Sequence, residues 1–543
     1  MKDLNRRFFP LAVIVLTSVF ANAQSVPDDI DARGACTSIA VGRKASADGS
    51  IITSHTCDGD CRTWMNFVQA QDHKAGEMEP VFQGRMWTQA FGDSTKVYKK
   101  GEIPQVAHTY RYLDTAYPCI NEKQLGIGET TIFGREMLKN PDGMLYIEEL
   151  ERIVLERCTT ARDAIRLIDH LTKTYGYADT GECLTIADKN EVWFFEIFGE
   201  GRDRKGAVWA AVRVPDDEVA VSANIPRIGH IDVKDTENYM ASANIFDVAK
   251  RLKLWDGKEE FCMWKVYGGT NLEKKEKNYD TREYFILSTL APSLNLNDKG
   301  ESLPLSVKPE KKLSVEDVSR LLGSYYEGTS LSMADRHKIP NPKKKDKEGN
   351  IVENEPDSIT SPVSNPWMRK DEVAMYNNMG DKGAMNTRTV SMPWCAYSTV
   401  VQLRSWLPDE VGGVVWVSFD NPGESPRIPI FAGCTEVPRM FLFCGQRNNR
   451  KDSAISLFRE ANRLATVRWG EFRNTLEPAR DYFWQKADRE IPFVESSWKE
   501  LNSKDPKEAE KMLNGYTADF FAATIMKWND MAQWFWYKTL WGF

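Results

Sequence analysis

The sequence predicts an α+β protein built from packed layers of sheets and helices, and two observations carry that prediction. Residues 36–235 are rich in short apolar segments of β-strand character, interrupted by one helical pair. Beyond residue 450 the pattern is helical and aromatic. Strands, a helix pair and further strands are typical of a layered sandwich rather than of alternating parallel units.

The first two strands are expected to form a hairpin, because "SADGS" (46–50) supplies turn residues between "SIAV" and "SII". Further strands are expected at 108–113, 124–133, 183–188, 191–199, 207–214, 218–224, 397–405 and 412–420. Helices are expected at 143–157, 159–176, 242–254 and 314–327. For the second of these, Thr159 or Thr160 is the expected N-cap and Gly176 the expected end. The charged stretch 339–358 is expected to be a solvated loop, and the tail is expected to pack Trp528, Trp534 and Trp541 on the body.

The N-terminus has the pattern of a secretory signal peptide over residues 1–23. Lys2, Arg6 and Arg7 precede an apolar core that is too short to span a bilayer comfortably, and "ANA" follows. We therefore expect a periplasmic or secreted protein without stable membrane insertion after processing, with an uncleaved anchor as the alternative. The net charge of −7 argues against nucleic acid as a partner. A homo-oligomer is possible.

Cys36 stands at the start of the first strand, where a hairpin needs no cysteine. If the chain is cut between Ala35 and Cys36, that residue carries both a thiol, with a pKa of about 8.5, and an α-amine, with a pKa of about 7.7–8.0. One residue then supplies the nucleophile and the base that accepts its proton. The alternative is a buried structural cysteine. Cys57 and Cys61 are close enough for a small disulfide, which the sequence leaves open.

A nucleophile of this kind needs a carboxylate that orients the amine and donors for an oxyanion. The second hairpin strand ends at Asp58, beside the beginning of the first strand, so Asp58 is expected near Cys36. Asn224 precedes Ile-Pro at the end of a later strand and is a candidate oxyanion donor. Each has an ordinary alternative role, as a turn residue and as a strand-terminating residue.

Five segments together resemble the dipeptidase A-type cysteine peptidases, a family that includes the secernins and belongs to the N-terminal-nucleophile hydrolases. They are "CTSIAVGRKASADGS", "NEKQLGIGETT", "GECLTIADKNEVWFFEI", "WAAVRVPDDEVAVSANIPRIG" and "YDTREYF". The resemblance runs from residue 36 to about 290, and 416–433 extends it. It implies a four-layer αββα sandwich, autocatalytic exposure of Cys36 and hydrolysis of small peptides.

The resemblance also implies roles for individual residues. Asp58 and Asn224 fall on active-site positions, Thr130 or Thr131 falls near a second oxyanion contributor, and Arg282 matches a later active-site arginine. Comparable hairpins in the wider superfamily carry an arginine where this chain has His55, which leaves support of the thiolate open.

The resulting domain prediction is a signal peptide at 1–23, a propeptide at 24–35, a hydrolase domain at 36–450 and a helical extension at 451–543. The predicted function is an exported dipeptidase that uses a thioester acyl-enzyme and requires no cofactor or metal, since the sequence has no CxxC pair and no HExxH. An amidase acting on N-acyl amino acids or lactams is the first alternative, and a non-catalytic peptide- or glycan-binding protein is the second.

Overall fold

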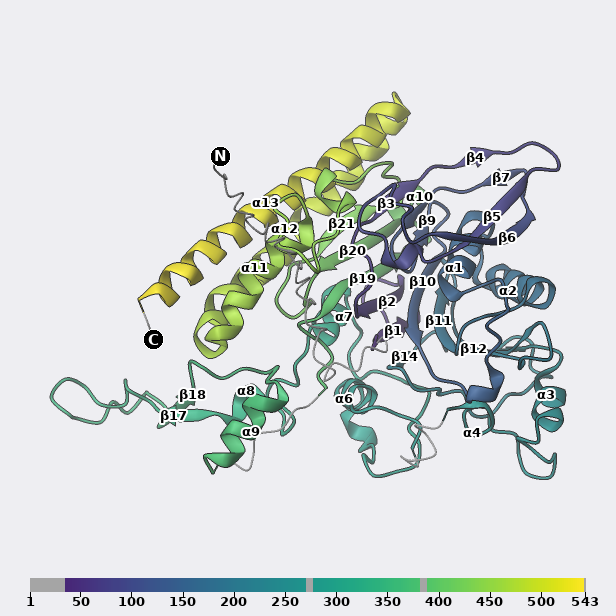
Figure 1. Cartoon of the computed structure of the whole chain (residues 1–543). Coiled ribbons are helices and arrows are strands. Elements are labelled where there is room, and N and C mark those ends of the chain that lie inside the picture. The colour runs from purple at the N-terminus through teal and green to yellow at the C-terminus, as the bar shows by residue number, and fades with distance from the viewer. Residues whose placement is uncertain (1–34, 270–276, 381–387, 542–543) are drawn as a thin grey trace, which may run out of the picture. The chain divides into compact units, whose positions relative to one another are not determined.

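The computed structural model of the chain describes residues 35–269, 277–380 and 388–541. The predicted signal peptide, and the predicted propeptide apart from Ala35, lie outside the described residues. Two large sheets, both antiparallel, organise the rest (Figure 1). In the first, seven strands follow the order β16 (Ser306–Val307), β14 (Val219–Ser222), β1 (Ser38–Val41), β2 (Ile51–Asp58), β19 (Cys395–Leu403), β20 (Gly413–Phe419) and β21 (Ile428–Phe431).

The second sheet has eight strands and lies against the first. Its order is β15 (Tyr239–Ala241), β13 (Ala207–Arg213), β12 (Val192–Gly199), β11 (Glu182–Ala187), β10 (Gly126–Thr131), β9 (Ile120–Asn121), β8 (Tyr112–Asp114) and β3 (Asn66–Val68). Strands β1 and β2 contact β10, β11 and β12 across the interface. At Gly128 the sheets approach so closely that a Cβ atom would lie 2.1 Å from the Ser54 carbonyl oxygen, so only glycine fits there.

Helices contact the strands of each sheet. Helices α1 (Ile147–Arg157) and α2 (Ala161–Tyr175) contact strands of the eight-stranded sheet, and α6 (Thr281–Leu290) and α7 (Val315–Leu322) contact strands of the seven-stranded one. Both caps expected for the second predicted helix are confirmed. The Thr160 side chain accepts a hydrogen bond from the Asp163 backbone N–H, and Gly176 follows the helix with a φ of 88°.

The C-terminal region is helical, as predicted, and consists of α11 (Ala454–Val467), α12 (Trp469–Asn502) and α13 (Pro506–Leu540). These helices contact one another, and α11 and α13 also contact β20 and β21 respectively (Figure 1). Trp528 is fully buried and its indole N–H donates to Asn462. Trp534 and Trp541, which were expected to pack on the body, are instead 40% and 78% exposed, because they lie on the outer face and at the end of α13.

The remaining elements are short. They are β4 (Gln71–Asp72), β5 (Met78–Gln83), β6 (Tyr98–Pro104), β7 (His108–Thr109), α3 (Ile245–Arg251), α4 (Met263–Tyr267), α8 (Met333–Arg336), β17 (Lys338–Pro340), β18 (Ser358–Thr360), α9 (Lys370–Asn378) and α10 (Asp409–Gly412). The strand expected at 108–113 is divided between β7 and β8, and the loop expected at 339–358 joins β17 to β18. None of the described helices combines the length and the apolar character that a bilayer crossing requires.

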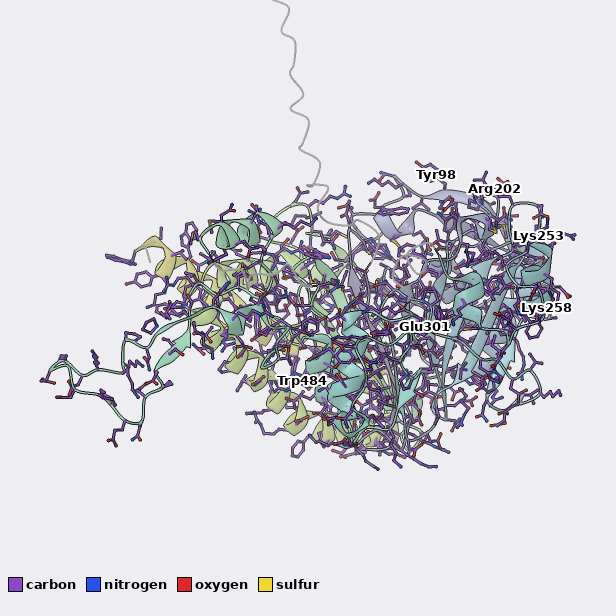
Figure 2. All side chains as sticks on the ribbon, turned by 90° about the horizontal axis from the view of Figure 1, so that it is seen from below. Tyr98, Arg202, Lys253, Lys258, Glu301 and Trp484 are labelled. Carbon is purple, nitrogen blue, oxygen red and sulfur yellow. The ribbon has the colours of Figure 1, made fainter. Side chains whose placement is uncertain are left out.

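Many charged side chains lie at the surface, and many large aromatic side chains lie in the core. Figure 2 shows Arg202, Lys253 and Lys258 at the edge of the molecule, where each is exposed. Trp484 of α12 is buried and packs on Trp416 of β20, with 5.0 Å between the ring centroids. The burial of large aromatic side chains between α12 and the seven-stranded sheet joins the C-terminal helices to the same core.

Candidate active site

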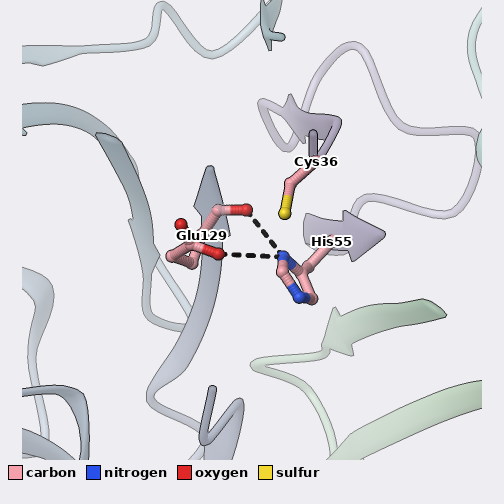
Figure 3. A group of neighbouring side chains, drawn as sticks. All are labelled: Cys36, His55 and Glu129. Carbon is pink, nitrogen blue, oxygen red and sulfur yellow. Dashed lines mark hydrogen bonds and ion pairs between the residues drawn. The ribbon is translucent and has the colours of Figure 1, made fainter. Parts of the chain in front are cut away.

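Cys36 lies two residues before the start of β1, a strand inside the seven-stranded sheet. Strand β1 pairs with β14 on one side and with β2 on the other, and Thr37 forms a bridge with Thr56. The side chain of Cys36 is buried, and its sulfur points toward His55 and Glu129 (Figure 3). The nucleophile predicted from the sequence is therefore held by rigid strands on both sides, which fixes its position.

Asp58 ends β2 beside Cys36, where the hairpin was expected to bring it. The Asp58 backbone oxygen accepts a hydrogen bond of 3.2 Å from the N–H of Ala35. Its carboxylate oxygen Oδ2 lies 2.6 Å from Nη2 of Arg388, and the same Nη2 donates to the Ala35 carbonyl oxygen, also at 2.6 Å. Arg388 thus joins the Asp58 carboxylate to the peptide bond that precedes Cys36.

Arg282 and Asn224 lie on the other side of the Cys36 main chain. Arg282 stands in the first turn of α6, which Asp280 caps, and its Nη1 donates to the Cys36 carbonyl oxygen at 2.8 Å. Its Nη2 donates to Oδ1 of Asn224 at 3.1 Å. Asn224 has a left-handed backbone, with a φ of 66°, and its Nδ2 donates to the carbonyl oxygen of Thr131 at 2.7 Å. Arg282 therefore positions the main chain of Cys36 and the amide group of Asn224.

Strand β10 contributes Glu129 rather than a threonine side chain. One ligand atom each from Cys36, His55 and Glu129 lie within 4.8 Å of one another. The Thr131 hydroxyl donates to Oε1 of Glu129 at 3.1 Å. Thr131 therefore supports Glu129. Among the described residues, no hydrogen bond joins the Thr131 side chain to the Cys36 sulfur.

His55 is neutral at physiological pH, because burial lowers its pKa to about 4. Its Nδ1–H donates to the Glu129 backbone oxygen at 2.6 Å, and in the described part of the chain its buried Nε2 has no hydrogen-bond partner. The imidazole therefore supplies no positive charge in place of the arginine that comparable hairpins carry. Arg388, which comes from a distant segment, brings a cation to Asp58 instead.

Burial raises the pKa of the Cys36 thiol well above its ordinary value, and the carboxylates of Glu129 and Asp58 raise it further. The sulfur consequently carries a proton at neutral pH while Cys36 remains in a peptide bond. Attack by sulfur requires a group that removes this proton. All ten cysteines are free, Cys57 and Cys61 included.

The group formed by Cys36, His55 and Glu129 could also hold a metal ion by its spacing. Thiolate, imidazole and carboxylate are ligands that zinc accepts, and structural zinc sites use four protein ligands. No fourth side chain of a ligating type joins these three among the described residues. Catalytic zinc sites, in contrast, have three protein ligands and one open position.

Of the five residues expected from the sequence, Asp58 and Arg282 contact the main chain on either side of Cys36. Asn224 joins this group through Arg282, and Thr131 joins it through its carbonyl oxygen and through Glu129. Sequence reasoning missed Arg388 and Glu129. Arg388 lies 330 residues from Asp58 and no local motif marks it. Glu129 lies in the segment "NEKQLGIGETT", two residues before Thr131. Because alternate residues of a strand share one face, the choice of Thr131 could have pointed to Glu129 as well.

A family model described as peptidase family C69 matches residues 35–482. The chain belongs to peptidase family C69. It is therefore a peptide hydrolase, and the matched region begins one residue before Cys36 and ends within α12. Family membership confirms the resemblance that the sequence motifs indicated.

Several curated relatives are named as probable dipeptidases. The chain is 27% identical over 469 residues to a probable dipeptidase of Latilactobacillus sakei, which covers 83% of this chain and 84% of the relative. It is 26% identical over 418 residues to probable dipeptidase B of Streptococcus pyogenes serotype M1, covering 73% and 71%. A probable dipeptidase of Salmonella dublin is 26% identical over 417 residues, covering 74% and 81%.

Among solved structures, penicillin V acylase from Agrobacterium tumefaciens matches 73% of this chain and 86% of its own, with 9% identity and a TM-score of 0.25. Similarity at this level carries no argument about the site.

Proposed function

We propose that this family C69 peptidase is an exported dipeptidase whose mature chain begins at Cys36. The observation that carries the proposal is the environment of the Ala35–Cys36 peptide bond. Its carbonyl oxygen accepts from the Arg388 guanidinium, and the N–H of Ala35 donates to Asp58. The signal-peptide pattern at 1–23 supports export. The two facing sheets with their flanking helices support an αββα arrangement of the N-terminal-nucleophile hydrolase type.

Self-cleavage in this proposal starts with attack of the Cys36 sulfur on the Ala35 carbonyl carbon. The guanidinium of Arg388 stabilises the oxyanion that forms, since charge-assisted donors stabilise such oxyanions. The thiol proton passes to the amide nitrogen, the C–N bond breaks, and a thioester remains. Water then hydrolyses the thioester, which releases a carboxylate at Ala35 and leaves Cys36 with a free thiol and α-amine.

Peptide hydrolysis repeats this chemistry on a substrate. The Cys36 amine accepts the thiol proton, and the sulfur attacks the scissile carbonyl. Asn224, held by Arg282 and Thr131, donates to the oxyanion. The ammonium of Cys36 protonates the leaving amine, and water activated by the same amine resolves the thioester. Asp58, paired with Arg388, orients the amine.

The decisive experiment is intact mass measurement and N-terminal sequencing of the wild type and of Cys36→Ala. We expect a mature start at Cys36 and dipeptide hydrolysis for the wild type, and retention of Ala35 with loss of activity for the variant. Cys183→Ala is a matched control, because Cys183 is equally buried on β11 outside the group around Cys36. A functional enzyme that begins elsewhere, or that survives Cys36→Ala, would exclude the proposal.

The second candidate function is an amidase acting on N-acyl amino acids with the same nucleophile. The uncharged acyl group of such substrates needs an apolar pocket, whereas the group next to Cys36 contains the buried carboxylate of Glu129. Comparison of Ala-Ala with an N-acyl alanine as substrate decides between the two. Faster hydrolysis of the N-acyl compound would favour the amidase.

A further inference from the structure

Glu129 is a fully buried carboxylate, and the ion pairs of the described chain give it no charged partner at neutral pH. Its Oε2 atom makes no hydrogen bond among the described residues. The one ion-pair contact recorded for it is with His55 Nδ1, at 3.6 Å, and His55 is neutral. Buried charges in proteins are normally paired, so an unpaired carboxylate next to a nucleophile points to a cationic ligand.

Glu182 of β11 prepares Glu129 for this ligand. The two side chains share one face of the sheet, since Glu129 pairs with Leu184 and Glu182 lies two residues away. Burial, Asp179 and Glu129 raise the pKa of Glu182 well above its ordinary value, which favours the protonated form of Glu182. Burial raises the pKa of Glu129 itself to about 7, so both its neutral and its ionised form are populated at neutral pH, and a cation bound beside it favours the ionised form.

The distance between the Glu129 carboxylate and the Cys36 sulfur fits the position of a dipeptide's α-ammonium group. In a reactive complex the sulfur lies about 3–3.5 Å from the scissile carbonyl carbon. The α-ammonium of the N-terminal residue is two bonds of about 1.5 Å from that carbon, and an ammonium–carboxylate hydrogen bond adds about 2.8 Å. A carboxylate about 5 Å from the sulfur therefore reaches the ammonium, and Glu129 has a ligand atom within 4.8 Å.

The amine of Cys36 itself does not use this position. The peptide bond that becomes the amine is adjacent to Ala35, which contacts Asp58 and Arg388. Asp58 is thus the carboxylate on the side of the Cys36 amine, and Glu129 lies on the side toward which the sulfur points (Figure 3). Thr131 and Asn224 are partly exposed, so this edge of the site is open to a substrate.

We propose that Glu129, supported by Glu182, binds the free α-ammonium of the substrate's N-terminal residue and so restricts the enzyme to peptides with an unblocked N-terminus. This inference rests on the proposed function, because it places the substrate by the attack of Cys36. It assigns substrate recognition to the charge of one buried side chain.

The test compares Ala-Ala with propionyl-alanine, which has the same carbon skeleton with a hydrogen atom in place of the ammonium group. For Glu129→Gln we expect kcat/KM for Ala-Ala to fall about 100-fold or more, as when one partner of a buried charge pair is lost. The value for propionyl-alanine should change by less than about threefold, because no cation is involved. Glu151→Gln is the matched control, since Glu151 is also a fully buried glutamate without hydrogen-bond partners among the described side chains. It should leave the ratio of the two substrates unchanged.

A second readout separates failure of this inference from failure of the proposed function. The negative charge of Glu129 raises the pKa of the Cys36 thiol, so Glu129→Gln should increase the rate at which iodoacetamide alkylates Cys36 at pH 7. Alanine amide, which carries the ammonium, should slow alkylation of the wild type and not of the variant. Equal losses for both substrates, or equal protection by alanine amide, would overturn the inference and leave the role of Cys36 intact. Wild-type enzyme that hydrolyses neither substrate and gains no protection would overturn both.

Discussion

Two buried carboxylates flank Cys36, and they differ in what they face. Asp58 is paired with Arg388 at 2.6 Å and contacts the main chain of Ala35. Glu129 contacts a neutral histidine and a hydroxyl group and has no cationic partner among the described residues. Each acid has one oxygen without a hydrogen-bond partner in the described chain, Oδ1 of Asp58 and Oε2 of Glu129. Both acids are buried, yet only Asp58 has its charge balanced by the protein.

The difference indicates that the two carboxyl groups have separate roles in the proposed mechanism. A carboxylate that is already paired has a fixed orientation and can hold the nucleophile's own amine in place. An unpaired buried carboxylate gains most from a cation that arrives from outside, because that cation removes the cost of its burial. The following predictions test this contrast between Asp58 and Glu129, from the largest expected effect to the smallest.

Asp58→Asn should have the largest effect. It removes the negative charge that orients the Cys36 amine and leaves Arg388 without its partner. We expect the rate of hydrolysis to fall about 10³-fold for Ala-Ala and for propionyl-alanine alike, as for loss of a group needed in acid–base catalysis. Asp48→Asn, at the turn of the same hairpin, is the control. A loss confined to Ala-Ala would indicate that Asp58, rather than Glu129, binds the substrate ammonium.

Arg388 should matter most for self-cleavage. Replacement by methionine removes the donor to the Ala35 oxygen, and we expect cleavage before Cys36 to slow by about 10²–10³-fold. Arg388→Lys retains the charge but not the planar geometry and should be intermediate. Time-resolved intact mass spectra of freshly expressed protein measure the rate. An unchanged cleavage rate in the methionine variant would show that Arg388 has no role in self-cleavage.

The pH dependence should separate the two substrates. Burial raises the pKa of Glu129 above its ordinary range, and ammonium binding requires the ionised carboxylate. As pH falls through this raised pKa, KM for Ala-Ala should therefore increase, whereas KM for propionyl-alanine should not. The acidic limb should be absent in Glu129→Gln. Parallel profiles for the two substrates would contradict a role for Glu129 in binding.

Thr131→Val should have a small effect. The variant loses one hydrogen bond to Glu129, and a neutral donor of this kind is worth about 0.5–1.5 kcal/mol. We expect kcat/KM for Ala-Ala to fall between about twofold and tenfold. The oxyanion role expected from the sequence would require a loss of about 10²–10³-fold for both substrates. Steady-state kinetics of the variant therefore distinguishes support of Glu129 from oxyanion binding.

Removal of metal should have no effect. The mechanism assigns the nucleophile and the base to Cys36, so activity after dialysis against EDTA should equal that of untreated enzyme. Added Zn²⁺ should inhibit, because the thiol, imidazole and carboxylate near Cys36 can bind it together. Loss of activity on chelation that Zn²⁺ restores would instead assign these three residues to a catalytic metal.

The parts of the site that were predictable from sequence are local or carried by motifs. The turn at 46–50 fixes the hairpin, and the hairpin brings Asp58 back to Cys36. Asn224 and Arg282 fall on active-site positions of the family, and in the structure Arg282 contacts the Cys36 carbonyl oxygen and holds Asn224 beside it by a hydrogen bond. Thr131 was expected as an oxyanion contributor, but its hydroxyl contacts Glu129, its neighbour on the same face of β10.

The sequence by itself indicated the family, a candidate nucleophile at Cys36 and the presence of strands around a helix pair, because these depend on short-range patterns and on one residue type at one position. Only the tertiary structure decided which charges are paired. The contact of Arg388 with Asp58 spans 330 residues, and the neutral state of His55 and the unpaired state of Glu129 follow from burial. Burial and long-range pairing result from how the sheets pack, and no local pattern in the chain encodes them.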